Sequence, residues 1–132
     1  MKKRVLVADD EPMTAELLAC MLDHRGFEVE RAYDGREALE RIREIRPDVV
    51  VLDVRMPAMD GHEVARHLRA DPELRHVPVV LFSSVDEADV QWKAAGADVF
   101  LQKPLDICVL PDLLQQLIDG MPPEPPMIRR YG

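Results

Sequence analysis

Five side chains that could together handle a phosphoryl group follow short apolar runs of the sequence. They are Asp9, Asp10, Asp53, Ser83 and Lys103. Carboxylates held a few ångströms apart repel one another, unless a divalent cation lies between them. Oxygen ligands suit Mg²⁺, which takes one or two carboxylates together with a phosphate. The residue types therefore indicate metal-assisted phosphoryl chemistry.

Asp53 is the strongest candidate for the reacting group. It ends the apolar run Val49 to Leu52, and a loop containing Pro57 and closed by Asp60-Gly61 follows it. A carboxylate can attack phosphorus and form an aspartyl phosphate. Mg²⁺ and a lysine can neutralise the charge on the equatorial oxygens, and a serine hydroxyl can donate a hydrogen bond to one of them.

The elements that must position these side chains alternate along the chain. The apolar runs predict strands over residues 4–8, 27–32, 48–53, 77–82 and 98–102. Amphipathic patterns predict helices over 12–25, 35–46, 61–70, 85–95 and 111–120. This alternation is typical of an α/β doubly wound fold, with a parallel sheet covered by helices on both faces. Ligands of such folds bind beyond the carboxyl ends of the strands, where all five candidate side chains would converge.

The first predicted helix has an apolar stripe. Met13, Leu17 and Met21, with Leu18 and Leu22 beside them, recur at helical spacing. We expect this stripe to form the buried side of the helix.

Cysteines and histidines offer no second site. Cys20 and Cys108 are far apart in apolar, helix-like surroundings, and we expect two reduced thiols in the core. His62 and His67 are five positions apart, whereas a zinc-protease helix needs histidines four apart on one face. We therefore expect no metal at this histidine pair.

Length and charge limit the class of protein. The chain has 132 residues and a formal net charge of −8, which disfavours a nucleic-acid groove. We expect one domain over residues 1–120 and a proline-rich tail, or the start of a linker, over 121–132. The basic N-terminus is too short for a signal peptide or membrane span, so we expect a cytoplasmic protein.

Taken together, several short motifs point to one family. They are the runs VLVADDEP from Val5, VLDVRMP from Val51, MDG from Met59, AGAD from Ala95 and LQKP from Leu101. In this order and at these spacings, the chain from Lys3 to about Asp119 resembles the receiver domain of two-component response regulators, the CheY-like family. The resemblance implies a five-stranded parallel sheet of order 2-1-3-4-5.

The resemblance also implies roles for the candidate residues. Asp53 would accept a phosphoryl group from a sensor histidine kinase or a phosphotransfer protein. Asp10, Asp53 and the backbone carbonyl of Arg55 would bind Mg²⁺ directly, and Asp9 would act mainly through water. Lys103 would contact the phosphoryl group.

The same resemblance implies how a signal would leave the site. Ser83 and Phe100 match the family's switch pair, in which the hydroxyl moves toward the phosphate and the ring moves inward. The surface of the predicted helix 85–95 (helix four), strand 98–102 (strand five) and helix 111–120 (helix five) would then contact an unknown downstream protein or fused effector. No direct binding of nucleic acid or membrane is expected. Such a chain is not an enzyme beyond its own phosphorylation and slow dephosphorylation.

Other interpretations stay open. The chain could be a receiver-like scaffold that binds partners without phosphorylation, and Asp9-Asp10 could also cap the first helix. An aspartyl-phosphate phosphatase would need a second acid where Arg55 stands, and a flavin-binding domain would need a phosphate-cradling loop where the first acids stand. Residues 83–96 look about two residues shorter than the family pattern, and Trp92 fits the core or a partner surface equally well.

Overall fold

The computed structural model describes residues 2–83, 95–102 and 109–120. Strands and helices alternate in the order β1 (Arg4–Ala8), α1 (Pro12–His24), β2 (Glu28–Ala32), α2 (Gly35–Ile45), β3 (Val49–Asp53), α3 (Gly61–Ala70), β4 (Val79–Ser83), β5 (Val99–Gln102) and α4 (Leu110–Ile118). The predicted strands lie within two residues of these bounds, and the helix predicted over 85–95 falls mostly outside the described ranges. Within those ranges, no helix has the length and apolarity needed to cross a membrane.

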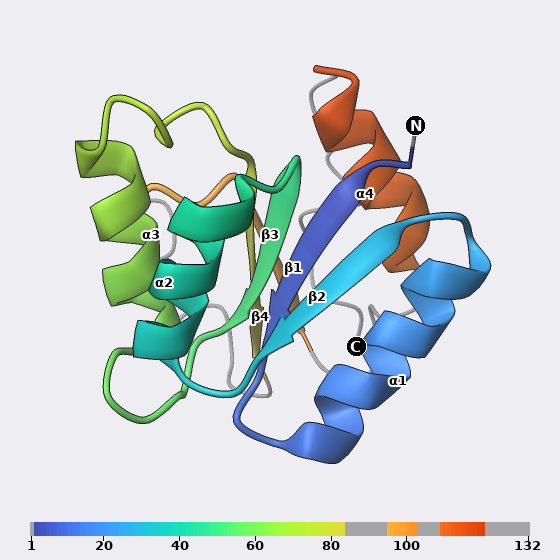
Figure 1. The fold of residues 1–132 in the computed structure, drawn as a ribbon, viewed down its shortest axis with the longest axis horizontal. Helices are drawn as coiled ribbons and strands as arrows, with labels where there is room; N and C mark the ends of the chain where they lie inside the picture. The colour runs from blue at the N-terminus through green and yellow to red at the C-terminus, as the bar shows by residue number, and fades with distance from the viewer. Residues whose placement is uncertain (1, 84–94, 103–108, 121–132) are drawn as a thin grey trace.

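All five strands are parallel and form one sheet, in the order β2-β1-β3-β4-β5. Figure 1 shows α2 and α3 on one face of the sheet and α1 and α4 on the other. This is the doubly wound α/β fold predicted from the alternating elements, with the strand order that the family resemblance implied.

β3 is the middle strand of the sheet and carries the central candidate residue. All five of its residues are buried. Val50 and Leu52 pack in the cluster beneath α2 and α3, whereas Val49 and Val51 pack in the cluster beneath α1 and α4. Full burial of such a side chain contributes about 1.5–3 kcal/mol, so the strand and the carboxylate at its end are strongly held in place.

The predicted buried stripe of α1 is confirmed for Leu18 and Leu22 but wrong for Met13 and Leu17. Met13 and Leu17 are 83% and 58% exposed, and Met21 is only partly buried. The side of the helix that faces the core combines Leu18 and Leu22 with two small residues, which allow close packing on the sheet. Its buried residues are Ala15, Leu18, Ala19 and Leu22.

The prediction of two core thiols is also wrong for one cysteine. Cys20 is a free thiol with an exposed side chain. It lies three positions after Leu17 and therefore on the same outward side of α1. Cys108 lies outside the described residues.

β2 forms one edge of the sheet and is rich in charge. Glu28 pairs with Arg4 at 2.8 Å. Glu30 pairs with Arg41 of α2, and Arg31 pairs with Glu16 of α1. The charged side chains of this edge strand are thus paired within the molecule on both of its faces.

Arg69 of α3 joins three segments at the amino ends of the strands. Its guanidinium donates to the carbonyls of Gly96, Arg75 and Val77 at 2.7, 2.8 and 2.7 Å. It also donates to the carboxylate of Asp98 at 2.8 Å. One side chain therefore fixes the connection before β4 and the turn before β5.

We expect Arg69→Ala to lower the free energy of unfolding by about 2–3 kcal/mol, because several acceptors lose a charged donor together. Urea denaturation measures this loss. Arg66→Ala is the control, since Arg66 is exposed on the same helix and should change stability by less than about 0.5 kcal/mol. An equal effect of the two substitutions would contradict the assignment of Arg69.

Candidate functional site

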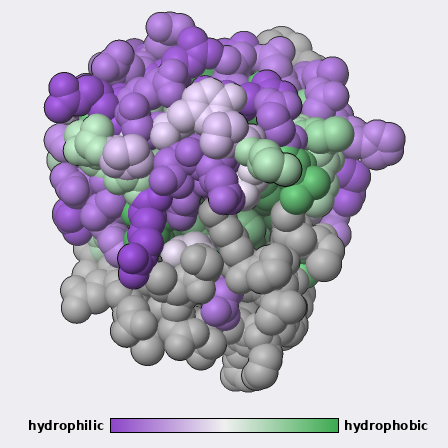
Figure 2. All heavy atoms as spheres, turned by 90° about the horizontal axis from the view of Figure 1, so that it is seen from below, coloured by the Kyte–Doolittle hydropathy of each residue, from purple (hydrophilic) through white to green (hydrophobic). Residues whose placement is uncertain are grey.

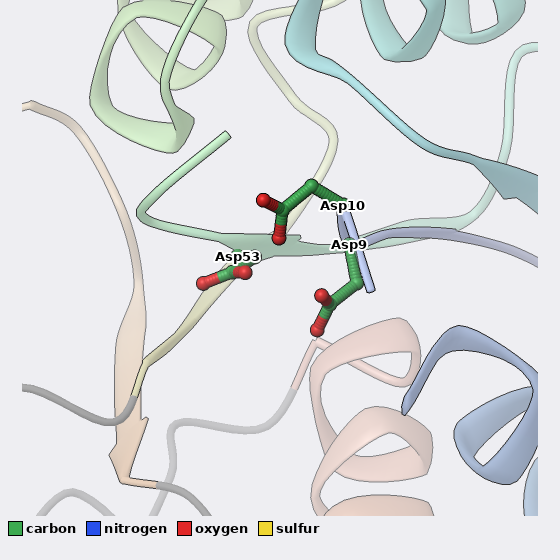
Figure 3. A group of neighbouring side chains, drawn as sticks. All are labelled: Asp9, Asp10 and Asp53. Carbon is green, nitrogen blue, oxygen red and sulfur yellow. The ribbon is translucent and has the colours of Figure 1, made fainter. Parts of the chain in front are cut away.

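Three carboxylates converge where β1 and β3 end. β1 pairs with β3 so that Ala8 stands opposite Leu52, which brings Asp9 and Asp10 beside Asp53. One oxygen of each carboxylate lies within 4.8 Å of the others. Figure 3 shows the three side chains directed toward a common space. The structure thus brings together the three acids that the strand pattern predicted to converge.

Burial makes this cluster costly without a counter-charge. Asp9 and Asp53 are only 2% and 7% exposed, whereas Asp10 is exposed. Two like charges about 4 Å apart repel by about 4 kcal/mol at an effective dielectric constant of about 20. Three carboxylate oxygens match the donors that hard divalent cations prefer, so the residues present fit a metal ion.

The turn after β1 leaves these acids available to the site. The backbone N–H of Glu11 donates to Asp9 Oδ1 at 2.9 Å, which closes a short side-chain turn. The N-cap position of α1 is occupied by Glu11, whose side chain makes no cap hydrogen bond. Asp9 and Asp10 therefore do not cap α1, and the alternative role considered for them is wrong.

The loop between β3 and α3 fixes Asp53 from the other side. The N–H of Arg55 donates to Asp53 Oδ1 at 3.3 Å, and the N–H of Gly61 donates to the carbonyl of Val54 at 2.9 Å. Asp60 caps α3 by accepting from the N–H of Glu63. The Arg55 side chain is exposed, so it points out of the protein.

Gly61 contributes a contact that the sequence pattern did not reveal. A Cβ at this position would lie 2.5 Å from the carbonyl oxygen of Asp53. Only glycine lets the start of α3 pass this close to the end of β3. The Asp60-Gly61 pair marked a turn in the sequence but not the strand that it approaches.

Ser83 and Phe100 lie on the strands beyond β3. Ser83 ends β4 and is 1% exposed, and its neighbour Phe82 is the register partner of Asp53. Phe100 is fully buried in β5 and packs in the cluster beneath α2 and α3. Two other residues singled out in the sequence, Lys103 and Trp92, lie outside the described residues. The same holds for residues 84–94 of the segment noted as short.

The family model of the response regulator receiver domain matches residues 5–115. The chain belongs to this family. The match covers both strands that carry the acid cluster, and it confirms the resemblance found in the motifs.

Curated relatives carry the receiver as part of longer proteins. The chain is 42% identical over 112 residues to the response regulator PleD of Caulobacter vibrioides, covering 83% of this chain and 25% of PleD. It is 42% identical over 106 residues to the DNA-binding response regulator MtrA of Mycolicibacterium smegmatis, covering 79% of this chain and 45% of MtrA. The chain therefore spans less than half the length of these relatives.

Solved receiver structures share the fold. A receiver domain of a signal transduction histidine kinase from Syntrophus aciditrophicus has a TM-score of 0.82 at 37% identity, covering 89% of this chain and 91% of that one. The chemotaxis response regulator CheY4 of Vibrio cholerae has a TM-score of 0.81 at 32% identity, covering 89% and 99%.

His62 is the second residue of α3 in this receiver domain, and its environment disfavours the charged form. Burial lowers the pKa of the imidazole, Asp60 opposes this shift, and Arg66 adds to it. Within the described part of the chain, its buried Nε2 has no hydrogen-bond partner. Among the described residues, the side chains grouped closely enough to hold a metal ion are those of the acid cluster. The expectation that His62 and His67 hold no metal stays a prediction.

The lowered pKa predicts a pH effect on stability. The unfolded chain binds a proton at His62 more readily than the folded chain. The contribution of neutral His62 to the free energy of unfolding is therefore complete above the unfolded pKa and is lost as pH falls below it. We expect His62→Gln to reduce the loss of stability between pH 7.5 and pH 5.5. Urea midpoints of both proteins at the two pH values measure the difference, with exposed His67→Gln as the control. Parallel pH profiles of wild type and His62→Gln would contradict it.

Proposed function

We propose that this receiver domain is a Mg²⁺-dependent phosphoacceptor that takes a phosphoryl group from a sensor histidine kinase, or a phosphotransfer protein, onto Asp53. The observation that supports this most is the convergence of Asp9, Asp10 and Asp53 at the end of a buried strand pair in a chain of the receiver family. Receiver domains of response regulators interact with histidine kinases, so the donor class follows from the family.

The roles of the residues follow from their chemistry. An oxygen of Asp53 forms the new bond to phosphorus as the bond from phosphorus to the donor histidine nitrogen breaks. Asp10, Asp53 and the carbonyl of Arg55 would hold Mg²⁺, with Asp9 acting through water. The ion supplies positive charge against the equatorial phosphoryl oxygens. Lys103 would add a second positive charge, and Ser83 a hydrogen bond.

Output would then pass through protein contacts. Ser83 and Phe100 would form the switch, and the surface of β5, α4 and the segment before β5 would carry the signal. Residues 1–120 would act as the receiver, and 121–132 would begin a linker or tail. MtrA is a DNA-binding protein, so the expected absence of nucleic-acid binding applies only to the receiver itself and stays a prediction. The convergence of the acids favours this function over a scaffold that acts without phosphorylation.

Intact mass spectrometry after incubation with Mg²⁺ and acetyl phosphate tests the proposal. We expect one added phosphoryl group on the wild type, none on Asp53→Asn, and at least about tenfold slower uptake by Asp10→Asn because a metal ligand is lost. Asp48→Asn is the matched control, since Asp48 is an exposed carboxylate just before the opposite end of β3. Uptake that persists in Asp53→Asn or without Mg²⁺ would contradict the proposal.

α1 offers a surface where the phosphodonor would dock. Met13, Leu17 and Cys20 are all exposed and recur at spacings of four and three residues, so they form one outward apolar strip. The helix begins two residues after Asp10, which places the strip beside the acids. Figure 2 views this end of the molecule and shows hydrophobic surface on the side of α1. An apolar helical face on the donor would fit it.

We expect Leu17→Asp to slow transfer from a phosphorylated kinase by about tenfold, the loss of about 1.4 kcal/mol in docking energy. The kinase is one selected for phosphorylating the wild-type chain. Phosphorylation by acetyl phosphate should not change, because a small donor needs no docking surface. Arg43→Asp on the exposed side of α2 is the control. Unchanged transfer from the kinase would place the docking surface elsewhere.

A further inference from the structure

Gly35 is the first residue of α2, and the loop after β3 occupies the space where a side chain would stand. A Cβ at Gly35 would overlap the carbonyl oxygen of Met59 and lie 2.5 Å from its carbonyl carbon. Gly35 is buried, and its φ is outside the left-handed region. Glycine is therefore required here by the close approach of another backbone and not by an unusual conformation.

The loop that meets Gly35 is tightly folded at residues 57–59, which form its crest. Ala58 has a φ of 69°, a left-handed conformation that a residue with a side chain adopts at an energetic cost. The N–H of Met59 donates to the carbonyl of Pro57 at 2.7 Å, and the N–H of Gly35 approaches the same carbonyl at 3.4 Å. The Met59 side chain packs against the cluster beneath α2 and α3. The crest is thus held between its own turn and the start of α2.

The same loop begins at the acid cluster. Its base is closed by the bond from the N–H of Gly61 to the carbonyl of Val54, and the N–H of Arg55 donates to Asp53. Because the base is closed, a shift of the crest cannot be absorbed there and must be taken up by the residues around Arg55. Mg²⁺ requires near-octahedral geometry and tolerates such a shift poorly.

We propose that Gly35 is a positioning residue for the metal site. Because it has no side chain, Gly35 lets the backbone of Met59 lie against the start of α2, and this contact fixes the position of the loop. The loop in turn fixes the position of the Arg55 carbonyl beside Asp53. This inference rests on the proposed function, in which that carbonyl is a metal ligand. It adds a residue outside the site, on a different helix, that controls affinity for the ion.

Isothermal titration calorimetry with Mg²⁺ alone tests the proposal. We expect Gly35→Ala to weaken Mg²⁺ binding by about tenfold. The Mg²⁺ concentration that gives half the maximal rate of phosphorylation by acetyl phosphate should rise by the same factor, and saturating Mg²⁺ should restore the rate. Gly26→Ala is the control, because Gly26 has a φ of +95° and no atom within 4 Å of an added Cβ. It should lose stability without any change in Mg²⁺ affinity.

A second pair of variants perturbs the loop from its other side and keeps the test valid if Gly35→Ala does not fold. Ala58→Val disfavours the left-handed crest while leaving Gly35 and the acids unchanged. Arg46→Val does the same at a φ of 49° at the end of α2 away from the site. We expect weaker Mg²⁺ binding for Ala58→Val only.

The outcomes separate the inference from the function on which it rests. Wild-type affinity in a folded Gly35→Ala or in Ala58→Val would overturn the role of Gly35 and leave the phosphoacceptor proposal standing. Equal losses in Gly26→Ala would also overturn it, since the effect would then be one of general stability. No Mg²⁺ binding and no phosphorylation by the wild type would overturn the proposed function itself.

Discussion

The repulsion among three carboxylates at the ends of β1 and β3 is the constraint on which the rest of this structure depends. Apolar burial along β3 opposes that repulsion, because its four residues before Asp53 are buried between two layers of helices. At about 1.5–3 kcal/mol for each fully buried side chain, this burial is of the same order as the repulsion among the carboxylates. The sheet can therefore hold like charges together, and a cation that relieved the repulsion would meet a site that is already assembled.

Close backbone contacts determine where the loop after β3 can lie. Gly61 brings the start of α3 against the carbonyl of Asp53, and Gly35 brings the start of α2 against Met59. Two helices that pack side by side on one sheet face thus meet the same loop at its base and at its crest. Neither glycine can be replaced by a larger residue without a shift of the backbone, because main-chain atoms fill the space where its side chain would stand.

Much of this arrangement could be predicted because parallel strands gather their carboxyl ends at one edge. That rule placed Asp9, Asp10 and Asp53 together, whereas the strand order came from the family resemblance. The rule does not determine which stripe of α1 faces the sheet, since two apolar stripes share the helical period and only packing selects between them. For the same reason Cys20 was wrongly assigned to the core. The part played by Gly35 could not be predicted, because no local pattern names the segment that approaches a residue from elsewhere in the chain.

The paired charges of β2 have a consequence for how copies of this domain can associate. An uncovered edge strand is a template onto which another chain can add by main-chain hydrogen bonding. Here Glu28, Glu30 and Arg31 are engaged by neighbours on both sides of the strand, so an incoming strand would have to displace ion pairs and bury charge. At high concentration, copies of this domain would consequently resist pairing their sheets through β2. Assemblies that form and dissociate with a signal would have to use helical surfaces on this side of the molecule.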